Sequence, residues 1–342
     1  MPLEWKPLAS VPELAGLLGQ SGLEGSSVSF LKHVKAVTIV TGGLTNRMYG
    51  CELSQDEGKI SEEAKTKWIV RVSGENVDVH FIDRTREFHC LGMAYEAELT
   101  PKAYYDAECG LFVQTFIEDA HTFDNADVAA NVPACVRLFF WLHQQHPSKY
   151  PKFVFNAFEI SRHYLKVARG HGAPLPPNFD ESLSILNDIE VAMAEGSLSK
   201  IALVPCHNDL LAANWVTGSV GGAASKLWLI DFEYAALGDR FFDLANFAVN
   251  CELSKELEQE MLDVYFGEGG WGDQHMARMK LFKCVSDMRE SLWSFVQWGV
   301  SKTSTQEFFE EYGNTCLARF QKSTGSDEFA KWMSDVTKEL NQ

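Results

Sequence analysis

The spacing of apolar residues changes along the chain and divides it into two parts. In the first part, short apolar and β-branched runs alternate with polar or glycine-containing turns, which is the pattern of β-strands. The runs predict strands over residues 37–40, 48–53, 68–72, 102–105 and 111–117. A short N-terminal helical segment is predicted within residues 1–35, and a longer helix is predicted over residues 82–99. The first part is therefore predicted to be rich in β-structure.

From about residue 125 onward, apolar residues recur at intervals of three and four positions, which predicts helices. The predicted helices cover residues 128–146, 155–168, 179–193, 241–249, 255–266, 271–298 and 306–320. Two short strands, over residues 201–204 and 227–230, are predicted in the middle of this part. The second part is therefore predicted to be mainly helical.

Three polar residues in and after these middle strands are of the types that phosphoryl transfer requires. Asp209, in the run HNDLLAAN, offers a carboxylate that can accept a hydroxyl proton, and Asn214 offers a neutral oxygen five residues later. Asp231 directly follows a predicted strand and offers the anionic oxygen that Mg²⁺ prefers. This order is typical of the catalytic and metal-binding loops of kinases. The alternative, capping residues at two turns, does not explain why these polar groups cluster in apolar sequence.

A glycine-containing turn, TGGLTN, lies between the first two predicted strands. Gly42 and Gly43 would allow backbone amides to approach a phosphate closely, although a plain hairpin has the same pattern. Arg71 lies on the next predicted strand, and Glu87 lies in the first turns of the following helix. Such a pair anchors nucleotide phosphates in kinases. A surface salt bridge is the alternative.

Composition and charge indicate which binding partners and which cellular compartment to expect. The 342 residues carry a formal net charge of -17, which argues against binding to nucleic acid. The eight cysteines form no Cys-x-x-Cys pair, and several lie in apolar runs, which predicts buried thiols in a reducing compartment. The first residues lack the pattern of a secretory signal, and no apolar stretch has the length of a membrane span. We therefore expect a cytoplasmic protein.

Taken together, these motifs resemble the choline/ethanolamine kinase family, especially its bacterial choline-kinase-like members, within the aminoglycoside-phosphotransferase-like group. The resemblance runs from about residue 36 to 320 and rests on TGGLTNRMYGCEL, WIVRVSG, FIDRTREFH, VPCHNDLLAANW, LWLIDFEYAALGDRFFDLANFAVN and SDMRESLWSFVQ. It implies an α+β, protein-kinase-like, two-lobe fold. The N-lobe, residues 1–118, would hold a small antiparallel β-sheet and bind the nucleotide. The larger, mainly helical C-lobe, residues 119–342, would bind the substrate and carry out catalysis.

The resemblance also implies roles for single residues. Asp209 is similar to the catalytic base, and Asn214 and Asp231 are similar to the Mg²⁺ ligands, which completes the implied catalytic set. Asp243, in FFDLANF, resembles the carboxylate that braces the catalytic loop, and His207 is expected to assist it. The linker near residues 114–118 would contact adenine through its backbone. The residues implied in ATP binding are Gly42, Gly43, Thr45, Asn46, Arg71, Glu87, Gln114 and Phe116.

Four residues are candidates for the acceptor end of the site. A quaternary ammonium group has no N–H to donate, so aromatic faces and carboxylates bind it. Trp293 resembles a pocket tryptophan of the family, whereas Glu290 stands where animal choline kinases have a second tryptophan. Both lie on the same helix face as Gln297. The alternative interpretation of Trp293 is that it packs in the core of the helical part and does not contact the acceptor. Glu233 and Tyr234, beside the metal loop, are the other candidates.

The implied function is a kinase that uses ATP and Mg²⁺ to phosphorylate the hydroxyl group of choline or a related amino alcohol. Ethanolamine, thiamine and aminoglycosides stay open as acceptors, and Trp293 argues mildly against an aminoglycoside. A pseudokinase that only binds is disfavoured, because the three implied catalytic residues are all present. A protein kinase is not expected, because the chain lacks G-x-G-x-x-G and Ala-Pro-Glu segments at the required places. The expected partner is a small molecule, and a homodimer stays open.

Overall fold

The computed structural model describes residues 4–19, 23, 26–40, 47–54, 66–72, 77–108, 110–302 and 304–338. The chain forms two compact units. The first contains Met1–Asp78, Ile82–Thr122 and Trp215–Glu233, and the second contains Val79–Phe81, Phe123–Asn214 and Tyr234–Gln342. The chain thus returns to the first unit after a long excursion in the second. The division of function at residue 118 stays a prediction.

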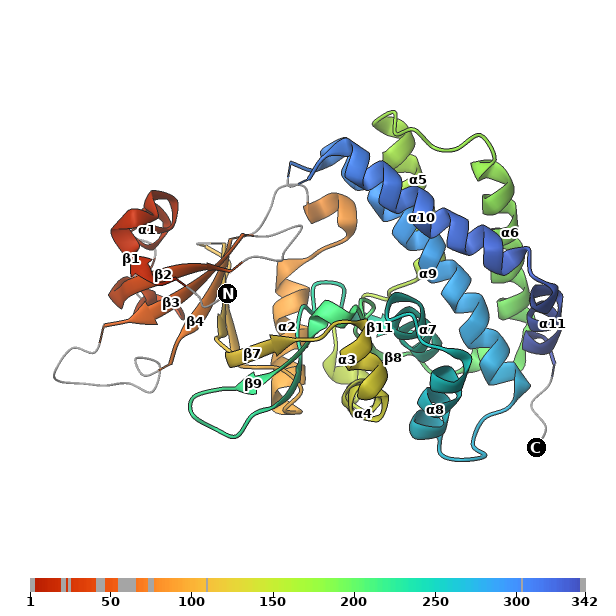
Figure 1. Cartoon of the computed structure of the whole chain (residues 1–342), viewed down its shortest axis with the longest axis horizontal. Coiled ribbons are helices and arrows are strands. Elements are labelled where there is room, and N and C mark those ends of the chain that lie inside the picture. The colour runs from red at the N-terminus through yellow and green to blue at the C-terminus, as the bar shows by residue number, and fades with distance from the viewer. Residues whose placement is uncertain are drawn as a thin grey trace. The chain divides into compact units, whose positions relative to one another are not determined.

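An antiparallel sheet forms the centre of the first unit (Figure 1). Within the described residues it has six strands in the order β1-β2-β3-β4-β6-β5. The strands are β1 (Lys6–Pro7), β2 (Val34–Val40), β3 (Arg47–Leu53), β4 (Trp68–Val72), β5 (Ala103–Asp106) and β6 (Leu111–Thr115). Alternate side chains of β2, β3, β4 and β6 are buried in one apolar cluster, as expected for strands that bury one face. Arg71 lies in the middle of this sheet, opposite Met48 on β3 and Phe112 on β6.

Among its described residues, the first unit contains the α-helices α1 (Pro12–Leu18) and α2 (Arg84–Glu96). Asp83 caps α2, because its carboxylate accepts hydrogen bonds from the backbone amides of Thr85 and Arg86. This cap fixes the helix start, and Glu87 follows within the first turn.

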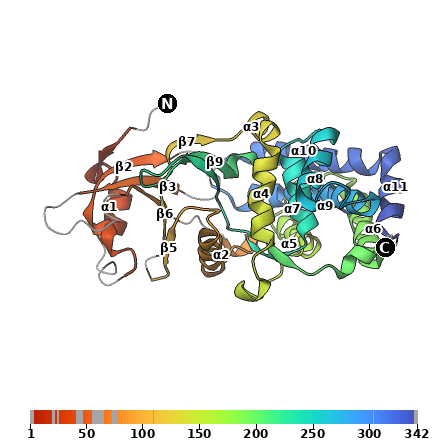
Figure 2. The same cartoon turned by 90° about the horizontal axis from the view of Figure 1, so that it is seen from below.

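The returning segment adds a second, smaller sheet to the first unit. Its order is β10-β9-β7 within the described residues, and both pairings are antiparallel. These strands are β7 (Glu118–Thr122), β9 (Trp215–Ser219) and β10 (Lys226–Leu229), and Figure 2 shows β7 and β9 side by side. The pairing explains why Asp231, which follows β10, belongs to the unit that also contains Arg71.

Helices build most of the second unit. They are α3 (Asn125–Ala130), α4 (Val132–His143), α5 (Ala157–Gly170), α6 (Phe179–Glu195), α7 (Arg240–Asn250), α8 (Lys255–Phe266), α9 (Asp273–Val300), α10 (Gln306–Thr324) and α11 (Asp327–Val336). The long helix α9 packs against α5, α6, α7, α10 and α11 and runs beside α10 in Figure 1. Two short strands, β8 (Val204–Cys206) and β11 (Ala236–Gly238), pair next to α7.

Short 3₁₀ helices complete the description. They are η1 (Leu8–Ser10), η3 (Ser29–His33), η5 (Val77–His80), η6 (Pro147–Lys149), η7 (Ser197–Lys200) and η8 (Ala212–Asn214). No helix in the described ranges has both the length and the apolar character needed to cross a bilayer. Seven cysteines are free and buried, as predicted, and Cys109 lies outside the described residues.

The predicted α+β fold, with an antiparallel sheet followed by a helical part, is confirmed. Some predicted elements were wrong in detail. One helix was predicted over residues 128–146, but the chain forms α3 and α4. The first helix ends at Ala130, and the second begins at Val132 with Pro133 in its first turn, where proline is favoured. The strand predicted over 201–204 lies instead at β8, and β1, β7, β9, β11 and α11 were missed.

Candidate active site

One buried carboxylate fixes the start of the loop that carries Asp209. Asp243 lies on α7, and its two oxygens accept hydrogen bonds from the backbone amides of His207, at 2.8 Å, and Asn208, at 2.7 Å. One turn later, the side-chain oxygen of Asn246 accepts from the amide of Leu210 at 2.6 Å. Because α7 is buried along nearly its whole length, these bonds attach the loop to a rigid part of the core. The bracing role expected of Asp243 agrees with this geometry.

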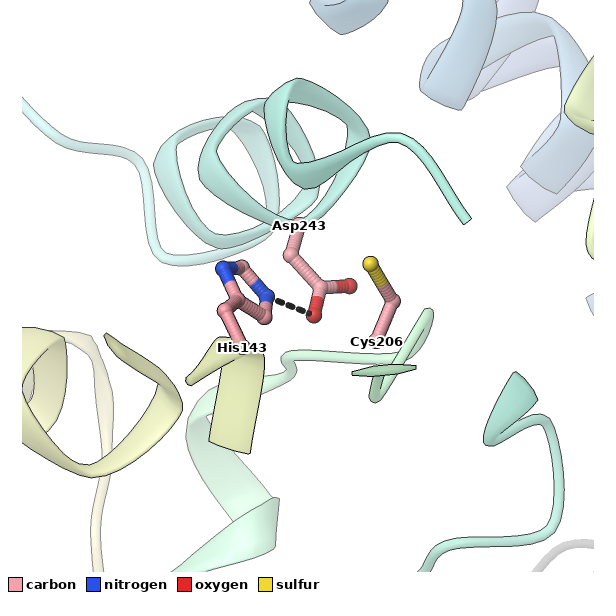
Figure 3. A group of neighbouring side chains, drawn as sticks. All are labelled: His143, Cys206 and Asp243. Atoms are coloured by element: carbon pink, nitrogen blue, oxygen red, sulfur yellow. Dashed lines mark hydrogen bonds and ion pairs between the residues drawn. The ribbon is translucent and has the colours of Figure 1, made fainter. Parts of the chain in front are cut away.

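The same carboxylate also contacts His143, at the end of α4 (Figure 3). Nε2 of His143 lies 2.9 Å from Oδ2 of Asp243, and Nδ1 lies 2.6 Å from the hydroxyl of Tyr265. Cys206 lies beside them, so that the three possible ligand atoms are within 4.8 Å of one another. Both ring nitrogens of His143 are hydrogen-bonded, and burial raises the pKa of the Cys206 thiol well above its usual value. This group therefore has the properties of a structural network and not those of a metal site.

Asp209 and Asn214 lie together in the braced loop. The side-chain nitrogen of Asn214 donates to the backbone carbonyl of Asp209 at 2.8 Å. Both residues are buried, and the amide oxygen of Asn214 is the atom that could ligate a hard cation. Asn208, just before Asp209, has a φ of 66°, in the left-handed region that asparagine tolerates better than most residues. Its side chain donates to the carbonyl of Tyr234 at 3.0 Å, which supports this turn.

Arg289 is a functional candidate that sequence reasoning missed. Its Nη2 atom on α9 lies 3.5 Å from Oδ1 of Asp209 and also pairs with Oε1 of Glu290. Its side chain is 1% exposed, so this guanidinium is a buried charge between two carboxylates. Arg289 is 80 residues from Asp209 in the chain, so no local spacing could connect them. The available signal was an adjacent Arg-Glu pair close to Trp293 in the helix predicted over residues 271–298.

The predicted acceptor residues Glu290 and Trp293 lie near each other and near Tyr312, which was not predicted. The hydroxyl of Tyr312 donates to Oε2 of Glu290 at 3.4 Å, and the Tyr312 and Trp293 rings are 6.3 Å apart. Trp293 is only partly buried, and its ring also lies 6.1 Å from that of Phe309. The Glu290 carboxylate, together with burial, raises the pKa of the Tyr312 hydroxyl. A carboxylate and aromatic rings are therefore present together in this unit.

A buried chain of charges in the first unit contains the predicted phosphate-anchoring pair. Arg71 donates to Oε1 of Glu87 at 2.6 Å, and Arg84 donates to Oε2 of Glu87 at the same distance. Arg84 also contacts Glu233 at 3.1 Å. The carboxylate of Glu233, predicted as an acceptor ligand, thus has Arg84 as its ion-pair partner. Since Glu87 is fully buried, its two arginine partners compensate a charge that would otherwise be costly.

Asp231 has the features of a cation ligand within the same unit. It follows β10, its side chain is 38% exposed, and its Oδ1 lies 3.9 Å from Nη1 of Arg71. Its φ of 66° places the backbone in the left-handed region, where strain often marks functional positions. The carboxylate of a partly exposed side chain fits the ligand preferences of Mg²⁺.

Of the other residues predicted to contact the nucleotide, Gln114 and Phe116 form hydrogen bonds within the protein, and the rest lie outside the described residues. Gln114 donates to the Thr100 hydroxyl at 3.2 Å, and the backbone amide of Phe116 donates to the carbonyl of Lys67 at 2.9 Å. Any contact of Phe116 with a base would therefore use its ring or its carbonyl. The predicted glycine-turn residues Gly42, Gly43, Thr45 and Asn46 lie outside the described residues.

The family model described as choline/ethanolamine kinase matches residues 37–265, which is more than half of the chain. This chain belongs to the choline/ethanolamine kinase family. Its matched region contains both loops, the bracing helix α7 and the Arg71–Glu87 pair. Membership in this family makes the chain a small-molecule kinase, a phosphotransferase that acts on an alcohol group.

Similar proteins agree with this kinase family. Protein LicA of Haemophilus influenzae is 24% identical over 265 residues, which cover 74% of this chain and 91% of that protein. A choline/ethanolamine kinase family protein from Mesorhizobium loti has a similar structure, with a TM-score of 0.74 and 21% identity over 96% of this chain and 99% of that one. The choline kinase LicA from Streptococcus pneumoniae matches with a TM-score of 0.65 and 22% identity, over 83% and 92% of the two chains. The two structures establish the protein-kinase-like fold.

Proposed function

We propose that this kinase transfers the γ-phosphate of ATP to the hydroxyl group of choline or a closely related amino alcohol, with Mg²⁺ as cofactor. The observation that carries the proposal is the position of Asp209. Its carboxylate lies on a braced loop and shares the guanidinium of Arg289 with Glu290, and Glu290 and Trp293 are three residues apart on α9. A base for the hydroxyl group and groups suited to an ammonium ion thus occur in one compact unit.

The chemistry follows from what each residue can do. Asp209 accepts a hydrogen bond from the acceptor hydroxyl and takes its proton as the oxygen attacks the γ-phosphorus. The bond from that phosphorus to the bridging oxygen breaks, and ADP leaves. Arg71, held by Glu87 at 2.6 Å, is suited to bind phosphate oxygens. Most of the rate acceleration would come from positioning and from charge stabilisation.

Mg²⁺ fits the donor atoms that the chain offers. Asp231 supplies a partly exposed carboxylate. Asn214 supplies its side-chain amide oxygen, while the nitrogen of the same amide donates a hydrogen bond to the backbone carbonyl of Asp209. We assign these two residues as ligands. When bound, the ion would neutralise phosphate charge.

Ethanolamine is the second candidate acceptor. The reason is that Glu290 provides a carboxylate at the position where animal choline kinases have a second tryptophan. A primary ammonium can donate hydrogen bonds to a carboxylate, whereas a quaternary ammonium can use only its charge and its methyl surface. The name of the Streptococcus pneumoniae structure, a choline kinase, supports choline. The free, buried cysteines support a reducing compartment, and we propose the cytoplasm.

A coupled ADP-release assay tests the proposed acceptor class. Purified protein would be given ATP and Mg²⁺ with choline, ethanolamine, thiamine or an aminoglycoside, and mass spectrometry would identify the phosphorylated product. We expect turnover with choline or ethanolamine that is lost when EDTA is added. Turnover with only the aminoglycoside or thiamine would refute the proposed acceptor.

A further inference from the structure

Three charged side chains form a buried cluster in the second unit. The Nη2 atom of Arg289 contacts both Asp209 and Glu290. Although burial opposes the charged form, the carboxylates of Glu290 and Asp209 raise the pKa of Arg289, so the guanidinium is charged at neutral pH. Two carboxylates and one guanidinium leave this cluster with one net negative charge.

Three titratable groups near the cluster, His80, Asp287 and Tyr312, do not change this balance near neutral pH. Burial lowers the pKa of His80 to about 4, which makes it neutral. Burial raises the pKa of Asp287 to about 6, and above that value Asp287 is paired with Arg319 at 2.7 Å. Glu290 and burial raise the pKa of Tyr312, so its hydroxyl is also neutral. The excess negative charge therefore belongs to the Asp209–Arg289–Glu290 cluster.

Among the described residues, Arg289 keeps one buried donor unsatisfied and is held between two aromatic rings. Its Nε atom is buried and has no hydrogen-bond partner within the part of the chain that the structure describes. The guanidinium lies over the rings of Tyr234, at 5.4 Å, and Phe155, at 5.9 Å, which limits its movement. A buried N–H without an acceptor is costly, and an oxygen atom of the acceptor molecule would satisfy it.

We propose that Arg289 makes the site select acceptors by their number of positive charges. The wild-type protein would prefer acceptors that carry one positive charge. This inference rests on the proposed function. An acceptor with a single ammonium group brings the cluster to neutrality, and an uncompensated charge in a buried site is unfavourable. A second ammonium group would leave an excess positive charge, and a neutral alcohol would leave the negative charge uncompensated. Arg289 is thus a specificity-determining residue that disfavours polycationic acceptors.

Four variants test the charge of the cluster, two by changing it and two by keeping it. Arg289→Met makes it more negative by one charge, and Glu290→Gln makes it neutral. The double variant Arg289→Met/Glu290→Gln restores the wild-type charge with different residues. Arg289→Lys keeps the charge while changing the shape of the side chain. Arg319→Met is the matched control, because it removes a guanidinium that pairs with Asp287 and not with the cluster.

The probes are three small alcohols that differ in charge: propanediol, isopropanolamine with one ammonium group, and diaminopropanol with two. Calorimetric binding and initial rates above pH 7 give the preference for one charge over two. We expect Arg289→Met to shift this preference toward diaminopropanol by roughly ten-fold or more, since charges a few ångström apart interact at least that strongly in a partly buried site. Glu290→Gln should weaken the preference for isopropanolamine over propanediol. The double variant and Arg289→Lys should retain the wild-type ratio.

The results separate this inference from the proposed function. If the wild-type protein neither binds nor phosphorylates amino alcohols, the proposed function fails and the inference fails with it. If it phosphorylates them but Arg289→Met keeps the wild-type ratio, or shifts it no more than Arg319→Met does, the inference alone is overturned. Should Arg289→Met not fold, Glu290→Gln and Arg289→Lys still decide, because a neutral cluster that kept the preference for a monocation would contradict the charge count.

Discussion

The Oδ1 atom of Asp243 accepts a hydrogen bond of 2.7 Å from the backbone amide of Asn208. Asn208 has a positive φ and directly precedes Asp209, so this bond stabilises the turn that presents the proposed base. The other oxygen of Asp243 accepts from the amide of His207 and contacts His143. One buried carboxylate thus fixes the backbone on which the acceptor chemistry depends.

Replacing Asp243 should therefore affect both stability and activity. Asp243→Ala leaves two buried amides without an acceptor, which we expect to lower the free energy of unfolding by about 2–5 kcal/mol. Activity at a temperature where the variant is still folded should also fall, because the loop loses its support. Chemical denaturation and steady-state kinetics would measure the two effects. Asp188→Ala, an exposed position on α6, is the control, and wild-type stability in Asp243→Ala would contradict the bracing role.

The pair formed by Arg71 and Glu87 gives a second prediction. Arg71→Ala should raise KM for ATP and lower kcat, because the phosphates lose a cation. Glu87→Ala should show a weaker version, since Arg71 loses its buried partner at 2.6 Å. The two effects should be non-additive in a double-mutant cycle, because both disturb one interaction. Fully additive losses would argue that the pair does not act as a unit.

Asp231 is expected to bind the metal ion. Asp231→Ala should abolish Mg²⁺-dependent binding of ATP at the productive site, since the ion loses an anionic oxygen. Titration of the variant with ATP, at several Mg²⁺ concentrations, would measure the loss. Glu108→Ala removes an exposed carboxylate from the same unit and should behave as wild type. Unchanged affinity for Mg·ATP in Asp231→Ala, together with normal activity, would remove Asp231 from the metal site.

Trp293 tests the class of acceptor. If its ring contacts a quaternary ammonium, Trp293→Ala should lose about 0.5–2 kcal/mol of that interaction. The value of kcat/KM for choline should then fall by several-fold to some tens-fold, with less effect on ethanolamine and little on KM for ATP. Trp141→Ala, which removes a 57% exposed tryptophan, serves as the control. A Trp293→Ala protein that melts earlier but keeps the wild-type ratio of choline to ethanolamine use would show that this ring is packing.

Much of the fold could be predicted because local pattern determines it. The strands β2, β3, β4 and β6 bury alternate apolar side chains, and α8 shows helical spacing with the same bounds as predicted. The missed strands lacked that signal. β7, with the sequence EDAHT, is mostly exposed and polar, and β11 has only three residues. Their strand conformation comes from pairing with β9 and β8, which local sequence does not reveal.

For the candidate site, too, local sequence predicted some residues but not those that depend on tertiary contacts. Asp209, Asn214 and Asp231 were predicted because kinase catalytic and metal-binding loops carry their functional residues in short recognisable motifs. Arg289 was missed because it meets Asp209 only through the tertiary contact of α9 with the loop, and Tyr312 because it meets Glu290 only through the packing of α10 on α9. A helix residue carries no mark in the sequence of which distant loop it contacts. Glu233 shows the converse, since its place beside the metal loop did not reveal Arg84 as its partner.

The most direct test of the proposed function is the rate at which Asp209→Asn forms the phosphorylated amino alcohol. The substitution keeps the size of the side chain but removes the carboxylate that would take the hydroxyl proton. Product would be quantified by mass spectrometry with saturating ATP and Mg²⁺, and nucleotide affinity would be measured in parallel. We predict a loss of about 10²–10⁴-fold in kcat, typical of a missing general base, with ATP binding largely intact. A variant that keeps more than roughly half of the wild-type kcat, against that expected loss, would contradict the assignment of Asp209 as the base.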